Sequence, residues 1–532
     1  MYIIIYDFGT SSVKTCLFEI NEDIRLITSA NAGYGMYISE DGGAEQDAEE
    51  WWEALRCTTH ALFDTSDVKP QEIEGMAFCT QMQGTVLVDE RGQALRRPMN
   101  YLDQKGYKEY KDCMGRGLIK VSGCSLYKLV RNLCVNYAGS TSAKDPVWKY
   151  KWVEKNEPDV FQKIYKWLDI SDYLVARCIG RIIRTADTAF ATFLYDTRKG
   201  KEGWNKGLVR MYGVKPEHLP EIIESTDIAG YLTEEAAKDL GLVEDIPVFG
   251  GGGDTTFVNI GAGCTRPGDT HIYMGTSGWV STFMDHQTVD IISMITGVLS
   301  AKRGYFNYYA ELETAGKCFE WAVKHLALDD IGIYLEQNSD DFEKRAISIY
   351  DYITKEADRI PPGANGVIFT PWLHGNRCPF EDSNAAGIFF NIRIENKKMD
   401  MIRAVLEGIC YHICWLLESS ERKVKTSEVI RFVGGGALSP VTCQMLADIT
   451  GRRIETVDHT QEAGAVGTAL VVAAGIRGVD VLELAGELVK VTHTYDPDPR
   501  NKEVYERNYK VFKKLYKTNA SNFRKINSIN NK

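Results

Sequence analysis

The sequence predicts an α/β protein made of two related halves. Apolar β-prone runs alternate with amphipathic helical stretches, as in folds that cover a sheet with helices. A short motif occurs twice, as Phe8–Ser12 and as Met274–Gly278, about half a chain length apart. Each copy has an apolar run before Gly-Thr-Ser and a β-prone run after it. The 532 residues therefore suit two large duplicated domains as well as the roughly three or four that length alone suggests.

The first half opens with a predicted β-hairpin. Residues 3–6 and 13–18 are apolar and β-prone, and the polar turn 7–12 joins them. Residues 46–63 carry apolar side chains at helical spacing and predict an amphipathic helix. Residues 73–80 predict a further strand, which ends in another polar turn.

Shorter elements fill the middle of the chain. Residues 86–89 predict a strand that runs into a turn, and residues 145–156 and 164–179 predict helices. Residues 201–245 alternate short helices with turns. The β-prone run 247–249 then leads into a glycine-rich stretch at the centre of the chain.

Four glycines, Gly250–Gly253, precede Asp254 in that stretch. So many glycines in a row indicate that the backbone packs against, or closely approaches, another group. Residues 258–262 and 270–274 follow, and the second Gly-Thr-Ser turn comes directly after them, at residues 275–278.

Helices dominate the last part of the chain. Residues 397–421 predict a long amphipathic helix, and the β-prone run 429–433 opens into Gly434–Ala437. Ser439 followed by proline is a helix start, with an N-cap before a proline at the first helical position. Residues 462–475 predict an alanine-rich helix. Beyond Asn501, aromatic residues at helical spacing predict a docking helix, and about the last dozen residues are expected to be frayed.

Charge and composition exclude several classes of protein. The chain has 62 Lys and Arg against 73 Asp and Glu, a net charge of −11, which disfavours a nucleic-acid partner because phosphate neutralisation needs basic residues. No apolar run reaches the roughly 20 residues of a membrane span, and no secretory signal is expected. The 13 cysteines form no C-x-x-C pair, so we expect reduced thiols and a cytoplasmic protein.

The sequence also lacks the common metal and nucleotide signatures. Cys410 and Cys414 are spaced for packing on a helix rather than for binding a metal, and no histidine pattern indicates zinc. There is no G-x-x-x-x-G-K-[ST], which disfavours a P-loop kinase, and no G-x-G-x-x-G, which disfavours a dinucleotide oxidoreductase.

Two aspartates stand where they could serve phosphate chemistry. Asp7 ends a strand beside a Gly-Thr-Ser turn, so it could hold a hydrated Mg²⁺ while the turn binds phosphate oxygens. Asp254 lies between the two halves, where it could accept a proton from an attacking hydroxyl. The alternative for Asp7 is a carboxylate that caps its own turn, and the alternative for Asp254 is an ordinary loop aspartate.

Amides and aromatic residues near Gln81–Gln83 and Asn100–Asp103 could bind a polyol, although loops at strand ends have the same composition. Taken together, the motifs resemble the FGGY family of carbohydrate kinases, in its xylulokinase-like branch, from about residue 2 to about residue 475. The matching stretches follow the family's order: Asp7–Lys14, Glu45–Asp47 with Trp51-Trp52, Gln81–Gly84, Asp103–Lys105, Lys149–Asn156, Gly251–Asp254, Gly275–Gly278, Gly375–Arg377 with Pro379, and Gly434–Ala437.

The resemblance implies two actin-like (ribonuclease H-like) domains with a catalytic cleft between them. It implies a sugar-binding N-terminal domain at residues 1–247, a nucleotide-binding C-terminal domain at 248–478, and a helical C-terminal extension at 479–532 with a frayed end. It also implies transfer of the γ-phosphate of ATP to a sugar hydroxyl with the help of Mg²⁺. Relatives suggest a homodimer by analogy only.

The same resemblance assigns the residues of the site. Asp254 resembles the catalytic base, and Asp7 resembles the carboxylate that organises Mg²⁺. The phosphate-facing hairpins are matched by Thr10, Ser11, Lys14, Gly275 and Thr276. The nucleotide pocket is matched by Gly316, Gly435, Gly436 and Ala437. The sugar-contacting set is matched by Met82, Gln83, Asp103, Asp254 and Thr255.

The sugar-facing motifs depart from the xylulokinase pattern. Gln83 stands where xylulokinases usually have histidine, and Thr255 where they usually have asparagine. Tyr101 and Lys105 replace a tryptophan and an arginine of the family. The sequence therefore predicts a carbohydrate kinase, with a ketopentose such as D-xylulose as the leading substrate.

Other readings stay open. Within the kinases, the substrate could be another ketose, a polyol or a sugar acid such as gluconate. A non-catalytic, nucleotide-binding sugar sensor is the rival from another class, and retention of both Asp7 and Asp254 argues against it. An actin-like or chaperone-like ATPase is disfavoured by the glycine run before Asp254 and by the loops suited to a sugar.

Overall fold

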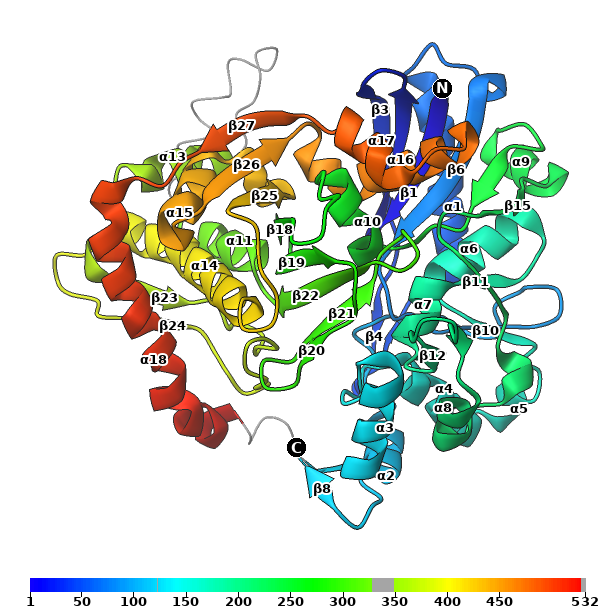
Figure 1. Ribbon diagram of the computed structural model, residues 1–532, viewed down its shortest axis with the longest axis horizontal. Helices are drawn as coiled ribbons and strands as arrows, with labels where there is room; N and C mark the ends of the chain where they lie inside the picture. The colour runs from blue at the N-terminus through cyan, green and yellow to red at the C-terminus, as the bar shows by residue number, and fades with distance from the viewer. Residues whose placement is uncertain (122, 328–348, 528–532) are drawn as a thin grey trace.

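The computed structural model describes residues 1–121, 123–327 and 349–527. It forms two sheet-centred lobes, with the N-terminal half coloured from blue through cyan to green and the C-terminal half from green through yellow to red (Figure 1). Helices α10 (Asp254–Gly261) and α16 (Ala463–Arg477) lie between the lobes and pack against each other (Figure 1). No helix among the described residues is both long enough and apolar enough to cross a membrane.

The first lobe is built on a mixed sheet in the order β15-β16-β6-β1-β2-β3, with β17 paired to β6. Strands β1, β2 and β3 are antiparallel neighbours, whereas β6 runs parallel to β1. The hairpin predicted from residues 3–18 is therefore confirmed. The strands of this sheet are β1 (Tyr2–Phe8), β2 (Ser12–Ile20), β3 (Ile24–Gly33), β6 (Ile73–Thr80), β15 (Ile228–Tyr231), β16 (Pro247–Phe249) and β17 (Gly252–Gly253).

Successive side chains of β1 point to opposite faces of this sheet, and both faces are buried. Ile4 and Tyr6 pack with helix α1 (Ala48–Asp64) on one face. Ile3 and Ile5 pack with α16 on the other. The first strand is thus a nearly continuous apolar run because it is covered on both sides.

The second lobe repeats the plan with a sheet in the order β20-β21-β22-β19-β18-β25-β26-β27. Helices α11 (Gly316–Leu326), α14 (Lys398–Ser420) and α15 (Pro440–Thr450) cover one face, and α10 packs on the other. The strands are β18 (Thr270–Met274), β19 (Gly278–Met284), β20 (Val289–Asp290), β21 (Ile295–Leu299), β22 (Phe306–Leu312), β25 (Val429–Val433), β26 (Arg453–Val457) and β27 (Val491–Tyr495).

The remaining elements connect and cover these sheets. The other α-helices of the described residues are α2 (Tyr107–Met114), α3 (Leu126–Asn136), α4 (Pro146–Asn156), α5 (Pro158–Phe161), α6 (Ile170–Ile179), α7 (Ala186–Ala191), α8 (Lys206–Tyr212), α9 (Glu234–Leu240), α11 (Gly316–Leu326), α13 (Ile349–Asp358), α14 (Lys398–Ser420), α15 (Pro440–Thr450), α17 (Val481–Leu488) and α18 (Lys502–Asn527). The other strands are β4 (Tyr37–Ile38), β5 (Ala44–Glu45), β7 (Val86–Val88), β8 (Lys120–Val121), β9 (Cys124–Ser125), β10 (Lys166–Leu168), β11 (Ile183–Thr185), β12 (Tyr195–Asp196), β13 (Gly203–Trp204), β14 (Glu221–Ile223), β23 (Ile368–Thr370) and β24 (Ile388–Phe390).

Two glycines allow the helices between the lobes to touch. A methyl group on Gly261 of α10 would lie 1.8 Å from the carbonyl oxygen of Ala463. One on Gly467 of α16 would lie 2.1 Å from the carbonyl oxygen of Phe257. Any larger residue at either position would push the two helices apart.

Most predicted elements are confirmed, and the exceptions have local causes. The long helix is α14, and the Ser439 hydroxyl caps α15 by accepting from the Thr442 N–H at 3.2 Å. The helix predicted for residues 164–179 is wrong in its first part, because Trp167 pairs with Leu87 in the β10–β7 ladder and α6 begins only after Asp169. Residues 201–245 also contain short strands that the turn-rich pattern concealed.

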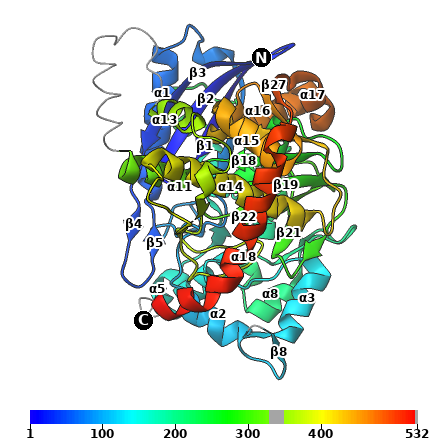
Figure 2. The same cartoon turned by 90° about the vertical axis from the view of Figure 1, so that its left-hand side faces the viewer.

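The predicted C-terminal helix is α18, which runs across the second lobe (Figures 1 and 2). It is helical through Asn527 and buries Phe523, so the frayed end expected from about residue 521 is wrong as far as Asn527. The rest of that expectation falls on residues 528–532, which lie outside the described residues. The helix docks because its aromatic face packs on α14 and on the β23–β24 region.

A buried polar contact joins α18 to α14. Arg403 donates from Nε to Glu407 at 2.8 Å and from Nη2 to the Tyr505 hydroxyl at 3.1 Å. That hydroxyl donates to Glu407 at 3.2 Å, and Tyr505 is only 2% exposed. Burial raises the pKa of the Glu407 carboxyl, and Arg403 opposes this.

We expect Tyr505→Phe to lower the free energy of unfolding by about 1–3 kcal/mol, because it takes one hydrogen bond from each of two buried charged groups. Tyr509→Phe, whose hydroxyl contacts Glu418 at the helix edge, is the matched control and should cost about 1 kcal/mol or less. Chemical denaturation of both variants measures the difference. Equal losses would show that the buried contact does not hold α18 in place.

Candidate active site

Adjacent strands of the first sheet bring Asp7 and the glycine run together. Asp7 of β1 pairs with Cys79 of β6, and Cys79 pairs with Gly252 of β17. Asp254 follows β17 directly and is the first residue of α10. The two predicted carboxylates therefore meet at one edge of this sheet, where the lobes come together.

Burial governs the acidity of Asp254. It raises the pKa of this carboxyl to about 7, while the Thr255 N–H, which donates at 2.7 Å, opposes the rise. The negative charges of Asp7 and Glu311 raise the pKa further. The pKa of a general base should lie near the pH at which it works, and Asp254 meets that condition near neutrality.

Asp187 holds the backbone on both sides of Asp254. Its carboxylate accepts from the Gly253 N–H and from the Thr256 hydroxyl, each at 2.8 Å. A methyl group on Gly252 would lie 2.3 Å from this carboxylate, so the glycine run gives Asp187 room. The predicted site residues did not include Asp187, because a carboxylate that acts through another segment leaves no local signal.

Asp7 is the less perturbed of the two carboxyls. Burial raises its pKa to about 6, Lys14 opposes the rise, and Glu462 adds to it. Lys14 itself pairs with Glu462, the residue just before α16. The ammonium group predicted to face phosphate thus also ties the first hairpin to the helix between the lobes.

The turns after β18 and β25 bring the predicted nucleotide residues together. The Gly316 N–H donates to the Gly275 carbonyl at 2.9 Å, which seats the start of α11 on the Gly-Thr-Ser turn. A methyl group on Gly436 would lie 2.6 Å from the sulfur of Met274, so the Gly434–Ala437 turn packs on the same strand end. Strands β18 and β25 run parallel, and therefore both turns lie at one edge of the sheet.

An aromatic row that the local sequence patterns did not predict lies close enough for both carboxylates to act on Tyr273. Tyr273 stacks on Trp279, with ring centroids 3.9 Å apart, and Trp279 contacts Tyr309. Asp7 and Asp254 both raise the pKa of the Tyr273 hydroxyl, after burial, which is the main cause. The alternation of side chains along β18 could have revealed this row. Ile272 faces the core, so Tyr273 must lie on the opposite face of the sheet.

The predicted sugar residues lie on both sides of Asp254. The Thr255 hydroxyl donates to the Met82 sulfur at 3.0 Å, which joins α10 to the turn after β6. Gln83 follows Met82 in that turn. The hydroxyl groups of Thr10 and Tyr101 are 3.2 Å apart, so the first hairpin touches the second predicted sugar loop.

Asp103 is placed differently from the other predicted sugar residues. It is 0% exposed, and its carboxylate accepts from the backbone N–H groups of Ala44 at 2.9 Å and Lys105 at 3.1 Å. Burial raises its pKa. The carboxylate therefore stabilises the loop through these backbone hydrogen bonds. Its predicted contact with a sugar stays a prediction.

Ion pairs line the junction of the lobes near Asp254. Arg377 lies 3.2 Å from Glu311, whose charge raises the pKa of Asp254. Lys144 of the first lobe lies 3.8 Å from Glu313 of the second. Each cation thus already faces a carboxylate.

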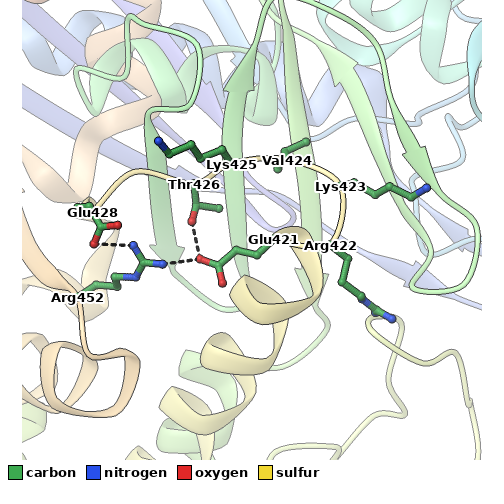
Figure 3. Close-up of a pocket in the computed structure, with 8 residues that line it drawn as sticks. All are labelled: Glu421, Arg422, Lys423, Val424, Lys425, Thr426, Glu428 and Arg452. Carbon is green, nitrogen blue, oxygen red and sulfur yellow. Dashed lines mark hydrogen bonds and ion pairs between the residues drawn. The ribbon is translucent and has the colours of Figure 1, made fainter.

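A separate pocket of about 460 Å³ lies on the loop between α14 and β25 (Figure 3). Arg452 sits there between Glu421 at 2.7 Å and Glu428 at 2.9 Å. None of the predicted site residues lines it. Arg452 pairs with both glutamates of this pocket, and the predicted site residues lie at the junction of the lobes instead.

Family models cover almost the whole chain. The N-terminal domain model of the FGGY family of carbohydrate kinases matches residues 2–261, and the C-terminal domain model matches residues 271–476. The chain belongs to the FGGY family of carbohydrate kinases. It is therefore a sugar kinase, and the predicted family resemblance is confirmed.

Relatives of two activities resemble the chain over most of its length. Xylulose kinase from Bacillus subtilis (strain 168) is 27% identical over 518 residues, 97% of this chain and 96% of that protein. Gluconokinase from the same organism is 25% identical over 509 residues, 93% of this chain and 92% of that protein.

Solved structures confirm the predicted actin-like two-domain fold. The xylulose kinase from Lactobacillus acidophilus superposes with a TM-score of 0.83 at 22% identity, over 99% of both chains. The gluconate kinase from Lactobacillus acidophilus gives the same TM-score, identity and coverage. Because kinases of both names share the fold equally, the fold does not choose between their substrates.

Proposed function

We propose that this FGGY kinase transfers the γ-phosphate of ATP to a hydroxyl of a small neutral sugar, with a ketopentose such as D-xylulose as the leading substrate and Asp254 as the general base. One observation carries the proposal. Asp254 begins a helix between the two lobes, near Asp7 and the Tyr273 side chain, with its pKa raised to about 7.

Asp254 would act on the attacking hydroxyl. A sugar hydroxyl holds its proton tightly, so the carboxylate should take it late, as the bond to phosphorus forms. The Gly253 and Thr256 contacts with Asp187 fix the backbone from which Asp254 projects. Positioning of this kind supplies a large share of catalysis in phosphoryl transfer.

The phosphate groups would lie between the two glycine-containing hairpins. The Thr10 and Thr276 side chains and the backbone N–H groups of these turns offer neutral donors, which suits a chain with a net charge of −11. Met82, Gln83 and Thr255 would then face the sugar, and Gly316 with the Gly434–Ala437 turn would face the nucleotide base.

The donor set fits a magnesium ion held together with phosphate. The Asp7 carboxylate makes no hydrogen bond or ion pair within residues 1–121, 123–327 and 349–527, so its oxygens are free to accept. No cluster of three or more His, Cys, Asp or Glu that could hold a metal occurs in that same part of the chain. Mg²⁺ commonly uses one or two carboxylates with water and substrate phosphates. When bound, it would neutralise phosphate charge.

Charge near Asp254 favours a neutral sugar over a sugar acid. Arg377 and Lys144 are compensated by Glu311 and Glu313, and both aspartates add negative charge. A gluconate carboxylate would have to displace one of these pairs or enter beside like charges, and both are unfavourable. A ketose or polyol needs only hydroxyl partners.

We also propose that residues 1–247 form the sugar side, residues 248–478 form the nucleotide side, and residues 479–532 form a docking extension. The homodimer and the cytoplasmic location stay predictions.

The test is ADP release in the presence of ATP and Mg²⁺ with a panel of ketopentoses, other ketoses, polyols and aldonates. We expect a ketopentose to stimulate release at least about tenfold more than gluconate, since each 1.4 kcal/mol of discrimination is a factor of ten. Preferred use of gluconate would overturn the neutral-sugar assignment. Sugar binding without any turnover would favour the sensor alternative.

A further inference from the structure

Gln83 adopts a backbone conformation that glutamine rarely takes. Its φ angle is +65°, in the left-handed region that favours glycine. Strain of this kind persists only where the surroundings hold it, and it concentrates at ligand sites. Gln83 lies in the turn after β6, beside Met82, which contacts Thr255.

Two buried charged side chains hold this turn. The Gln83 and Gly84 N–H groups donate to the Asp169 carboxylate at 3.1 and 2.8 Å. The Lys149 ammonium donates to the Gln83 carbonyl at 2.8 Å and to the Asn100 carbonyl at 2.5 Å. Hydrogen bonds therefore hold the strained residue at both its N–H and its carbonyl.

The two side chains that hold Gln83 are both anchored to helices. Lys149 belongs to α4 and is 0% exposed. Asp169 is 1% exposed, caps α6 through the Ile170 N–H at 2.8 Å and has Arg184 at 4.0 Å. Burying two charged groups has an unfavourable desolvation free energy, and their hydrogen bonds to this turn offset part of it.

The Gln83 side chain is not used by the fold. Its amide makes no hydrogen bond to any residue in the described part of the chain, although both backbone groups of Gln83 are bonded. An amide offers both donors and acceptors, so it can bind sugar hydroxyls without a charge. The structure therefore fixes the backbone of Gln83 and leaves its side chain free for a ligand.

We propose that Lys149 and Asp169 are positioning residues that clamp Gln83 in its left-handed conformation, so that its amide faces a hydroxyl of the sugar and sets substrate preference. The inference rests on the proposed function. It gives a role to Lys149, the first residue of the family-like stretch Lys149–Asn156.

Gln83→Gly separates strain from recognition. Glycine accepts φ +65° freely, so the melting temperature should stay the same or rise, whereas KM for the sugar should rise about tenfold with the loss of a hydrogen-bond partner. KM for ATP should change less than twofold. Asp245→Gly is the matched control, because Asp245 is exposed with φ +66° and should give the stability gain without a kinetic change. An unchanged sugar KM in Gln83→Gly would overturn the proposal.

The clamp itself is tested by a double-mutant cycle. Lys149→Met and the isosteric Asp169→Asn should each raise the sugar KM several-fold while KM for ATP stays within twofold. If both act through Gln83, combining either with Gln83→Gly should leave the sugar KM within about twofold of that of Gln83→Gly alone. Additive effects would overturn the positioning role. Asp169→Asn keeps the test valid if Lys149→Met does not fold.

A panel in which no sugar stimulates ADP release would refute the proposed function rather than the clamp. Isothermal calorimetry with D-xylulose would then decide the clamp. Binding weakened in Gln83→Gly and Asp169→Asn but not in Asp245→Gly supports it, and equal binding in all four proteins, the wild type included, overturns it.

Discussion

Asp254→Asn should lower kcat for sugar phosphorylation about 10³-fold while leaving the fold intact. Loss of a positioned general base costs roughly 10²–10⁴-fold. Asparagine keeps the shape of the side chain and the contact with the Thr255 N–H, which donates to Oδ1 at 2.7 Å. The negative charge is removed, and with it the ability to take the hydroxyl proton.

The stability of this variant should move in the opposite direction to its activity. The pKa of Asp254 is raised to about 7 in the folded chain from an ordinary value of 3.8, so the folded state binds the proton more tightly than the unfolded state. Ionisation of Asp254 therefore destabilises the fold as pH rises from about 4 to about 7. At pH 8, Asp254→Asn should melt at or above the wild-type temperature.

The measurements are kcat from coupled ADP release and the melting temperature at pH 8. Asp23→Asn, which changes an exposed aspartate of the β2–β3 turn, is the control and should match the wild type in both. An Asp254→Asn enzyme within tenfold of the wild type would refute the general-base role. A strongly lowered melting temperature would assign Asp254 to the fold instead.

The raised pKa of Asp254 also determines how kcat/KM depends on pH. The kcat/KM of the wild type should fall below pH about 7, because the protonated form of Asp254 cannot accept the hydroxyl proton. The negative charge of Asp7 is one cause of the raised value, so the falling limb of Asp7→Asn should shift to lower pH. A profile that is flat between pH 6 and about 8 would contradict the assignment.

The sequence could predict those features of the site that are formed by residues close together in the chain. Asp7, the Gly-Thr-Ser turns and the glycine run before Asp254 are local patterns, and the strand register brings them to one place. Helix α14 and the hairpin follow from apolar periodicity in the same way.

Features that join distant segments could not be read from local patterns. The Asp169 and Lys149 contacts with Gln83 span more than 60 residues, and the Lys14–Glu462 pair joins residues that are 448 positions apart. The missed strand β10 has the same origin, since Lys166–Leu168 is a strand only because β7 lies beside it. Tertiary pairing decided each of these outcomes, and local propensity did not.

Asp7→Asn should lower kcat/KM for ATP about 10²-fold at low magnesium, because the phosphates would lose an electrostatic partner of their counter-ion. Asparagine keeps an oxygen at the end of β1 but removes the charge. The pKa of Asp7 is about 6, so the wild-type carboxylate is ionised at the assay pH of 8 and the substitution changes its charge there.

Rescue by magnesium distinguishes this role from a structural one. If Asp7 organises the ion, raising Mg²⁺ should restore part of the lost activity of Asp7→Asn, because mass action offsets weaker binding. Asp254→Asn should gain nothing from the same treatment, since its defect lies in proton transfer. Titration calorimetry of ATP with and without Mg²⁺ gives a second readout, in which only the magnesium-dependent part of the affinity should weaken. Equal rescue of both variants, or of neither, would show that the two carboxylates do not divide the work in this way. The proton-accepting role would then have to be sought elsewhere, although burial and the negative charge of Asp7 raise the pKa of Asp254 to about 7.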